Sequence, residues 1–287
     1  MKVPPRFACV VAAVSLFAAT SASGQNYTDL FFGNPVQATN GYHSQLGDYY
    51  TGTTFDFLDV APSSGHGVDM RLTVTAVTSP RYSYEGALPD YSAAEGEPGG
   101  DLGFLLAYKG GAGSGGDFGP GSMTYNLEFF AGGSDFSDPF VIPDFRLMIY
   151  DIDGEGTQDE SVAAFGEDGL LSYQLFSGTE IAVTDTGDGY FRFAGPGIVR
   201  DEDDPRTAFI LRYQNTSSIR LQVIANTHPN SQNNNGVFGA IDGNLSLLNS
   251  SGLPAPVYLV PEPSSALLVA LAAAAAAGRR RRKCSGG

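Results

Sequence analysis

Residues 68–76 read Val-Asp-Met-Arg-Leu-Thr-Val-Thr-Ala, and this alternation decides the fold class. Apolar side chains occupy every second position, with polar ones between them. A period of two places one face on a core and the other in solvent, which is typical of a half-buried antiparallel strand. The same alternation recurs at 123–129, 145–150, 209–213 and 219–225, so we predict an all-β protein.

Turn-forming residues separate these stretches. Glycine adopts a positive φ without steric cost, so an Asp-Gly pair between two strands favours a tight hairpin turn. Such pairs occur at Asp153-Gly154, Asp168-Gly169, Asp188-Gly189 and Asp242-Gly243. We expect consecutive hairpins from residues 171–176, 180–184 and 190–193. About ten strands between residues 55 and 248 would then form an antiparallel β-sandwich, either jelly-roll-like or immunoglobulin-like.

The charge of the central part of the chain limits its partners. The whole chain has a formal net charge of −15, but residues 25–260 hold 9 basic and 30 acidic residues, a net charge of −21. Such a surface repels phosphate backbones and anionic headgroups, so we expect no nucleic-acid binding. Divalent cations and neutral polymers remain compatible partners.

The N-terminus is typical of a secretory signal peptide. Lys2 and Arg6 precede an apolar stretch over residues 7–20, and small residues follow at 21–24. The apolar stretch is shorter than the roughly 20 residues that a membrane-spanning helix needs. We therefore predict that a signal peptidase removes residues 1–24 and that the sandwich domain covers 25–248. An uncleaved membrane anchor is the alternative.

The C-terminus has three parts in a fixed order. A Ser/Pro linker over 249–259 leads to Val260-Pro261-Glu262-Pro263, then to an apolar stretch over 264–278, and then to basic residues. The basic residues are Arg279, Arg280, Arg281, Arg282 and Lys283. The two prolines cannot continue a helix, so a hydrophobic helix would begin after them. The basic residues would hold the end of that helix on the cytoplasmic side.

This order of Pro-Glu-Pro motif, apolar helix and arginine cluster resembles the PEP-CTERM sorting signal. The resemblance covers residues 260–283 and implies an exported protein of a Gram-negative bacterium that makes exopolysaccharide. It further implies that an exosortase-type enzyme cleaves near Pro261, Glu262 and Pro263 after transient anchoring in the inner membrane. The product would reach the cell surface or the extracellular matrix. A permanent single-span anchor is the alternative.

Residues 151–160 carry the densest group of carboxylates directly after a predicted strand. These are Asp151, Asp153, Glu155, Asp159 and Glu160. Calcium prefers six to eight oxygen ligands, which alternating carboxylates on a tight turn can supply. The spacing is not that of an EF-hand, because residue 162 is Val and residue 163 is Ala where that loop ends in Glu. We predict a candidate Ca²⁺ site, the alternative being an acidic turn that binds nothing.

No catalytic pattern emerges from the sequence. The three histidines, His43, His66 and His228, are far apart and lack a metal-binding spacing. Cys9 lies in the predicted signal peptide, and Cys284 directly follows the C-terminal basic residues. We therefore predict a non-enzymatic structural or adhesive module. A carbohydrate-binding module for polysaccharide, using tyrosines such as Tyr49, Tyr50, Tyr82, Tyr84 and Tyr91, is the second hypothesis, and a secreted hydrolase is the third.

Overall fold

The sandwich is seen in a computed structural model that describes most of the central part of the chain. The described residues are 27–33, 35–39, 51–62, 67–78, 82–83, 87–91, 101–108, 120–154, 158–201, 204–227, 237–245 and 255–259. Both predicted terminal signals, residues 1–24 and 260–283, lie outside them. Within this part of the chain, no helix is long and apolar enough to cross a membrane.

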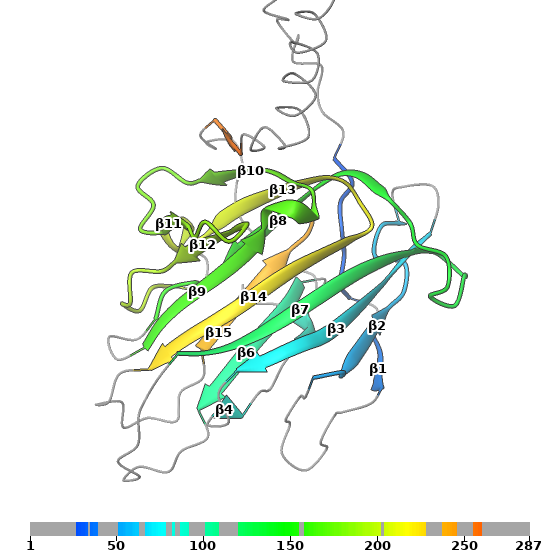
Figure 1. Ribbon diagram of the computed structural model, residues 1–287, viewed down its shortest axis with the longest axis horizontal. Coiled ribbons are helices and arrows are strands. Elements are labelled where there is room, and N and C mark those ends of the chain that lie inside the picture. The colour runs from blue at the N-terminus through cyan, green and yellow to red at the C-terminus, as the bar shows by residue number, and fades with distance from the viewer. Residues whose placement is uncertain are drawn as a thin grey trace, which may run out of the picture.

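Two antiparallel eight-stranded sheets form the domain (Figure 1). Sheet one has the order β1 (Pro35–Thr39), β2 (Thr54–Phe57), β3 (Val68–Thr78), β7 (Pro120–Ala131), β14 (Ser218–Thr227), β9 (Gln158–Phe165), β12 (Tyr190–Ala194) and β11 (Ala182–Asp185). Sheet two has the order β16 (Val257–Tyr258), β10 (Leu170–Leu175), β13 (Phe209–Thr216), β8 (Ile142–Tyr150), β15 (Val237–Asp242), β6 (Asp101–Tyr108) and β4 (Tyr82–Ser83), while β5 (Ala87–Tyr91) also pairs with β6. The predicted all-β antiparallel sandwich is thus confirmed, with more strands than the ten expected.

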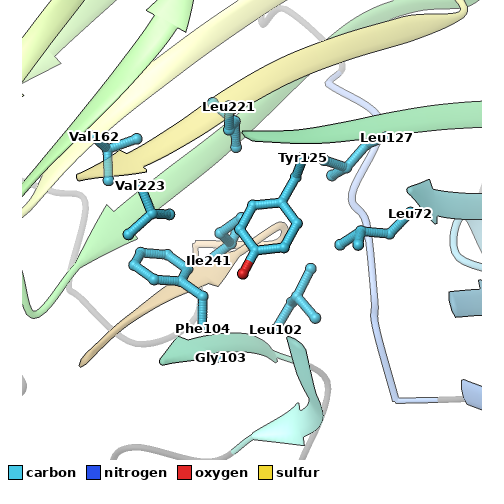
Figure 2. Close-up of a pocket in the computed structure, with 10 residues that line it drawn as sticks. All are labelled: Leu72, Leu102, Gly103, Phe104, Tyr125, Leu127, Val162, Leu221, Val223 and Ile241. Carbon is cyan, nitrogen blue, oxygen red and sulfur yellow. The ribbon is translucent and has the colours of Figure 1, made fainter. Parts of the chain in front are cut away.

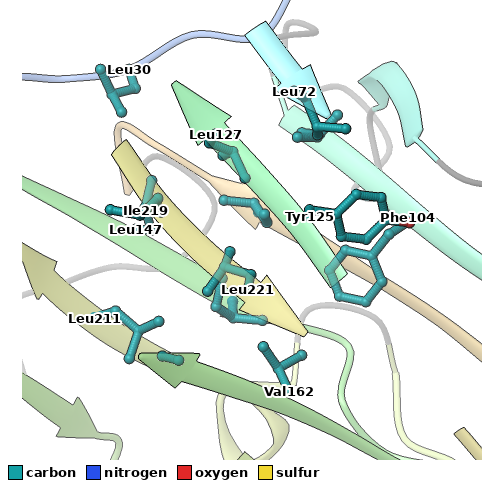
Figure 3. Close-up of a cluster of buried hydrophobic side chains, with 14 of the residues drawn as sticks. Leu30, Leu72, Phe104, Tyr125, Leu127, Leu147, Val162, Leu211, Ile219 and Leu221 are labelled. Carbon is teal, nitrogen blue, oxygen red and sulfur yellow. The ribbon is translucent and has the colours of Figure 1, made fainter. Parts of the chain in front are cut away.

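The alternating stretches form the strands that the sequence predicts. In β3 the side chains of Val68, Met70, Leu72 and Val74 are buried, as the period of two requires. Figure 3 shows Leu127 and Leu221 of sheet one in the same apolar cluster as Leu147 and Leu211 of sheet two. This cluster between the sheets is the main core.

Aromatic rings join the two sheets. Phe129 of β7 meets Phe145 of β8 edge-on, with ring centroids 5.4 Å apart. Phe193 of β12 stacks on Phe209 of β13 at 4.2 Å. Edge-to-face and offset-stacked pairs contribute beyond the area they bury, so these contacts fix how one sheet lies on the other.

The prediction that residues 171–176, 180–184 and 190–193 form consecutive hairpins is wrong in one respect. Strands β11 and β12 do form a hairpin, with Val183 opposite Phe193. Strand β10, however, pairs with β13 and β16 in sheet two. The chain leaves β10 through a connection tied to the 3₁₀ turn η3 (Pro205–Thr207), where the Glu180 N–H donates to the Arg206 carbonyl at 2.8 Å. Alternation predicts a strand but not the sheet that it joins.

The Asp-Gly pairs divide into two kinds. Gly154, Gly169 and Gly189 have φ values of 98°, 87° and 88°, as predicted. Of these three, however, only Gly189 lies in a hairpin, between β11 and β12, because Gly154 and Gly169 each lie between strands of different sheets. Gly243 does not have a positive φ, and a Cβ atom on it would lie 2.5 Å from the Leu30 carbonyl oxygen. At this position glycine is required by close backbone approach.

Candidate functional site

The acidic turn, residues 151–154, lies directly after β8 and is buried. Asp151 has a φ of 59°, in the left-handed region that Asp tolerates better than most residues. Asp151 and Asp153 are 9% and 8% exposed, and Glu160 at the start of β9 is 6% exposed. Three of the five carboxylates predicted to bind Ca²⁺ are therefore inside the domain rather than at an open loop tip.

Backbone N–H groups donate to the carboxylates of this turn. Asp153 accepts hydrogen bonds from the N–H groups of Gly154 and Arg200, and Glu160 accepts from the Asp153 N–H at 3.2 Å. Burial raises the pKa of Asp153, and the hydrogen bonds from Arg200 and Gly154 oppose that shift. The carboxylates of Asp153 and Glu160 thus accept hydrogen bonds from backbone N–H groups that would otherwise lack an acceptor.

A covering loop, residues 195–200, packs on the acidic turn. The Gly195 N–H donates to the Glu160 carbonyl at 2.9 Å, and the Gly197 N–H donates to the Asp153 carbonyl at 2.7 Å. A Cβ atom on Gly195 would lie 2.2 Å from the Ile152 carbonyl oxygen. Only glycine allows the two backbones to approach this closely.

Arginine side chains neutralise the carboxylates around the covering loop. Arg200 donates to Glu180 through Nε and Nη2, both at 2.8 Å, and Arg206 donates through Nε to Asp204 at 2.9 Å. The hydrogen bonds from Arg200 lower the pKa of Glu180, and those from Arg206 lower that of Asp204. Sequence analysis missed this network, because Arg200 lies 20 residues from its partner.

The structure does not assemble a complete metal site among the described residues. Within them, no three His, Cys, Asp or Glu side chains are grouped so that they could hold a metal ion. The described residues include Asp151, Asp153, Asp159 and Glu160, whereas Glu155 lies outside them. Calcium binding by the five carboxylates therefore stays a prediction.

The interior contains a small apolar cavity between the two sheets (Figure 2). Its volume is about 10 Å³, room for roughly one water molecule. The lining side chains are apolar or aromatic and come from β3, β6, β7, β9, β14 and β15, namely Leu72, Leu102, Phe104, Tyr125, Leu127, Val162, Leu221, Val223 and Ile241. A cavity this small, without a carboxylate or histidine in its lining, is a packing feature of the core.

Two further groups of predicted residues lie outside the described part. They are the sorting residues 261–263 and 279–283, and the side chains of the tyrosines proposed for sugar stacking. Tyr82 and Tyr91 belong to strands whose backbone is described, but their side chains are not. The carbohydrate-binding hypothesis therefore stays a prediction.

Comparison with known proteins identifies the C-terminal segment. Residues 259–282 match the PEP-CTERM protein-sorting motif. The chain carries a PEP-CTERM sorting signal. This confirms the resemblance that the sequence predicts for residues 260–283, and a PEP-CTERM signal implies an exported protein. No curated protein sequence matches the chain.

Two solved structures resemble the domain that precedes the PEP-CTERM signal. The N-terminal domain of the Streptococcus gordonii adhesin Sgo0707 has 11% identity and a TM-score of 0.45, over 74% of this chain and 50% of that chain. The adhesin domain of PrgB from Enterococcus faecalis has 12% identity and a TM-score of 0.38, over 77% of this chain and 72% of that chain. This chain thus spans half of the Sgo0707 structure, and neither similarity bears on what it binds.

Proposed function

We propose that the protein is a structural or adhesive module of the cell surface or extracellular matrix of a Gram-negative bacterium. An exosortase-type enzyme would sort it after a signal peptidase has removed the N-terminal signal. The observation that carries the proposal is the match of residues 259–282 to the PEP-CTERM motif, directly after an antiparallel sandwich. The C-terminal helix would anchor the chain transiently in the inner membrane.

A non-enzymatic role fits the interior of the domain. The carboxylates of Asp153 and Glu160 accept hydrogen bonds from backbone N–H groups, which is a structural use of buried acids. The apolar cavity is too small for a substrate. Binding of polysaccharide stays the second candidate partner, and retention of the mature protein on a glycan column would favour it.

The sorting claim is tested by replacing the prolines of the motif. Pro261→Ala combined with Pro263→Ala should leave the uncleaved chain in the inner-membrane fraction of the native host. Pro254→Ala, upstream of the matched residues, is the control and should be processed normally. Normal release of the double variant would contradict sorting at this motif.

The proposal includes Ca²⁺ bound by residues 151–160, supported by five carboxylates within ten residues. A site with a Kd of about 10 µM would stabilise the fold by about 2.7 kcal/mol at 100 times that concentration. Thermal unfolding in about 1 mM CaCl₂ should then show a midpoint a few degrees higher than in chelator. Asp151→Asn with Glu155→Gln should abolish the shift, whereas Asp185→Asn with Asp188→Asn should retain it. An unchanged midpoint in the unsubstituted protein would remove calcium from the proposal.

A further inference from the structure

The described chain ends in a strand that pairs with the edge of sheet two. Strand β16 is antiparallel to β10, with Tyr258 opposite Ser172 and Val257 opposite Tyr173. The Leu259 N–H donates to the Leu171 carbonyl at 3.0 Å and extends the pairing by one residue. These residues belong to the segment 249–259 that the sequence suggests as a linker, so the end of that linker is part of the sheet.

The register determines which N–H groups of this strand can bond to β10. Hydrogen-bonded and non-hydrogen-bonded pairs alternate along an antiparallel ladder. Because the Leu259 N–H points at β10, the Val257 N–H does so too, whereas residues 256 and 258 direct their N–H groups away. Pro256 therefore costs no ladder hydrogen bond. Continued in the same register, the ladder would require an N–H at position 261, which proline lacks.

The sorting motif consequently begins very close to the folded domain. One residue, Val260, separates Leu259 from Pro261, and the two residue steps between them span at most about 7 Å. An enzyme that cleaves near Pro261 has to surround extended chain on both sides of the scissile bond. The residues on the N-terminal side of that bond are the ones paired with β10.

The same strand is weakly held. It comprises two residues, and Val257 and Tyr258 are 46% and 55% exposed. Leu259 is only partly buried where it packs against the main core. Short edge strands with exposed side chains open at low free-energy cost compared with the centre of a sheet. Detachment of β16 therefore need not disturb the rest of the sandwich.

We propose that residues 255–259 form a clasp on the edge of β10 that controls access to the sorting signal. In the closed state residues 257–259, which directly precede the motif, are paired with β10, and the sorting enzyme acts on the chain only after β16 detaches. The rate of processing then scales with the fraction of molecules whose clasp is open. This inference rests on the proposed function, because it requires that the signal is processed.

A disulfide across the clasp would test the closed state. Ser172 and Tyr258 face each other in a non-hydrogen-bonded pair, whose Cα atoms are typically about 4.5 Å apart, within the range that a disulfide bridges. In full-length Ser172→Cys/Tyr258→Cys, the disulfide should form after export and slow maturation at least about tenfold in a pulse-chase experiment. A reducing agent should restore the rate, and each single cysteine variant should mature normally.

Two proline substitutions form a matched pair for the open state. Val257→Pro removes an N–H that points at β10, so the clasp should open and maturation should be several-fold faster. Tyr258→Pro removes an N–H that points away from β10 and should mature at the unsubstituted rate. Both positions lie upstream of the matched residues 259–282, so the motif itself is intact.

The outcomes separate the clasp from the sorting claim. Maturation of the disulfide-locked variant at the unsubstituted rate would overturn the clasp, and so would equal rates for the two proline variants. If the unsubstituted chain is not processed, or if Pro261→Ala/Pro263→Ala is processed normally, the proposed function fails instead.

Discussion

Two turns use the same Asp-Gly dipeptide and differ in how they are stabilised. Asp153-Gly154 follows β8 and Asp168-Gly169 follows β9, and both glycines have a positive φ. In each turn the carboxylate accepts a hydrogen bond from the backbone N–H of a distant arginine, Arg200 in the first and Arg220 in the second. Both carboxylates are therefore bound by the backbone N–H group of an arginine far away in the sequence.

The side chains of the two arginines make the difference. The Arg220 guanidinium folds back onto Asp168, with Nη2 2.7 Å from Oδ1, and this raises the pKa of Arg220. The Arg200 guanidinium instead donates to Glu180, and burial raises the pKa of Asp153. In the first turn, Asp153 makes buried polar contacts beneath the covering loop. In the second turn, Asp168 forms an ion pair with Arg220 close to solvent. The two turns share a dipeptide and a positive glycine φ, and the packing around each turn determines its electrostatics.

The largest expected effect follows from backbone packing at the first turn. Gly195→Ala would place a Cβ atom 2.2 Å from the Ile152 carbonyl oxygen, so the covering loop has to move. We expect a loss of about 3–4 kcal/mol, at or above the upper end of overpacking costs, in chemical unfolding of the purified protein. Gly166→Ala at the second turn is the control, because its nearest atom, the Gly189 carbonyl oxygen, is 3.3 Å away. Equal losses would show that the two turns are packed alike.

The next largest loss of stability should come from removing the carboxylates of the two turns. Asp153→Ala leaves the buried N–H group of Gly154 and the partly buried N–H group of Arg200 without their acceptor, and we expect a loss of about 2–3 kcal/mol. Asp168→Ala should cost about 1 kcal/mol, because the Arg220 side chain is 34% exposed and water can replace the lost contacts. Chemical unfolding at neutral pH measures both. A greater loss for Asp168→Ala than for Asp153→Ala would contradict the larger stabilising role assigned to the first turn.

The sequence predicts the strands and the positive φ of three glycines because their determinants are local, whereas the turns at Gly154 and Gly169 join strands of different sheets and are not the hairpin turns expected. The alternation at 68–76 and the Asp-Gly pairs act within a few residues, so β3 and three positive-φ glycines appear where expected. The acidic segment stands out in the sequence only by the density of its carboxylates. The hydrogen-bond partners of Asp153 in this segment are the N–H groups of Gly154 and Arg200, and Arg200 is 47 residues away in the sequence. No local pattern encodes a contact at that separation, nor the pairing of β10 with β16.

The pH dependence of stability should separate the turns further. Since the folded-state pKa of Asp153 is raised above its ordinary value of 3.8, the folded protein binds more protons than the unfolded chain just above that pH. The contribution of Asp153 to the free energy of unfolding therefore falls as pH rises through this window. The total fall is about 1.4 kcal/mol for each tenfold difference in the proton affinity of Asp153 between the folded and the unfolded protein. Thermal midpoints between about pH 3.5 and 7 should show the stability of Asp153→Asn rising relative to the unsubstituted protein. A constant difference would mean that Asp153 titrates normally.

The smallest effect should have the opposite sign and come from Glu180. Its pKa is lowered by the hydrogen bonds from Arg200, so its carboxylate stabilises the fold above its ordinary pKa of 4.5, and this is lost as pH falls through the lowered value. Glu180→Gln should therefore lower the thermal midpoint slightly at pH 7 and converge with the unsubstituted protein in acid, since partly exposed ion pairs contribute little. The same variant frees the Arg200 guanidinium, which lies on the loop that covers Asp153. If that guanidinium then turned to Asp153, the fall in stability with rising pH that is assigned to Asp153 would become smaller. The first turn would then contain an ion pair, as the second does.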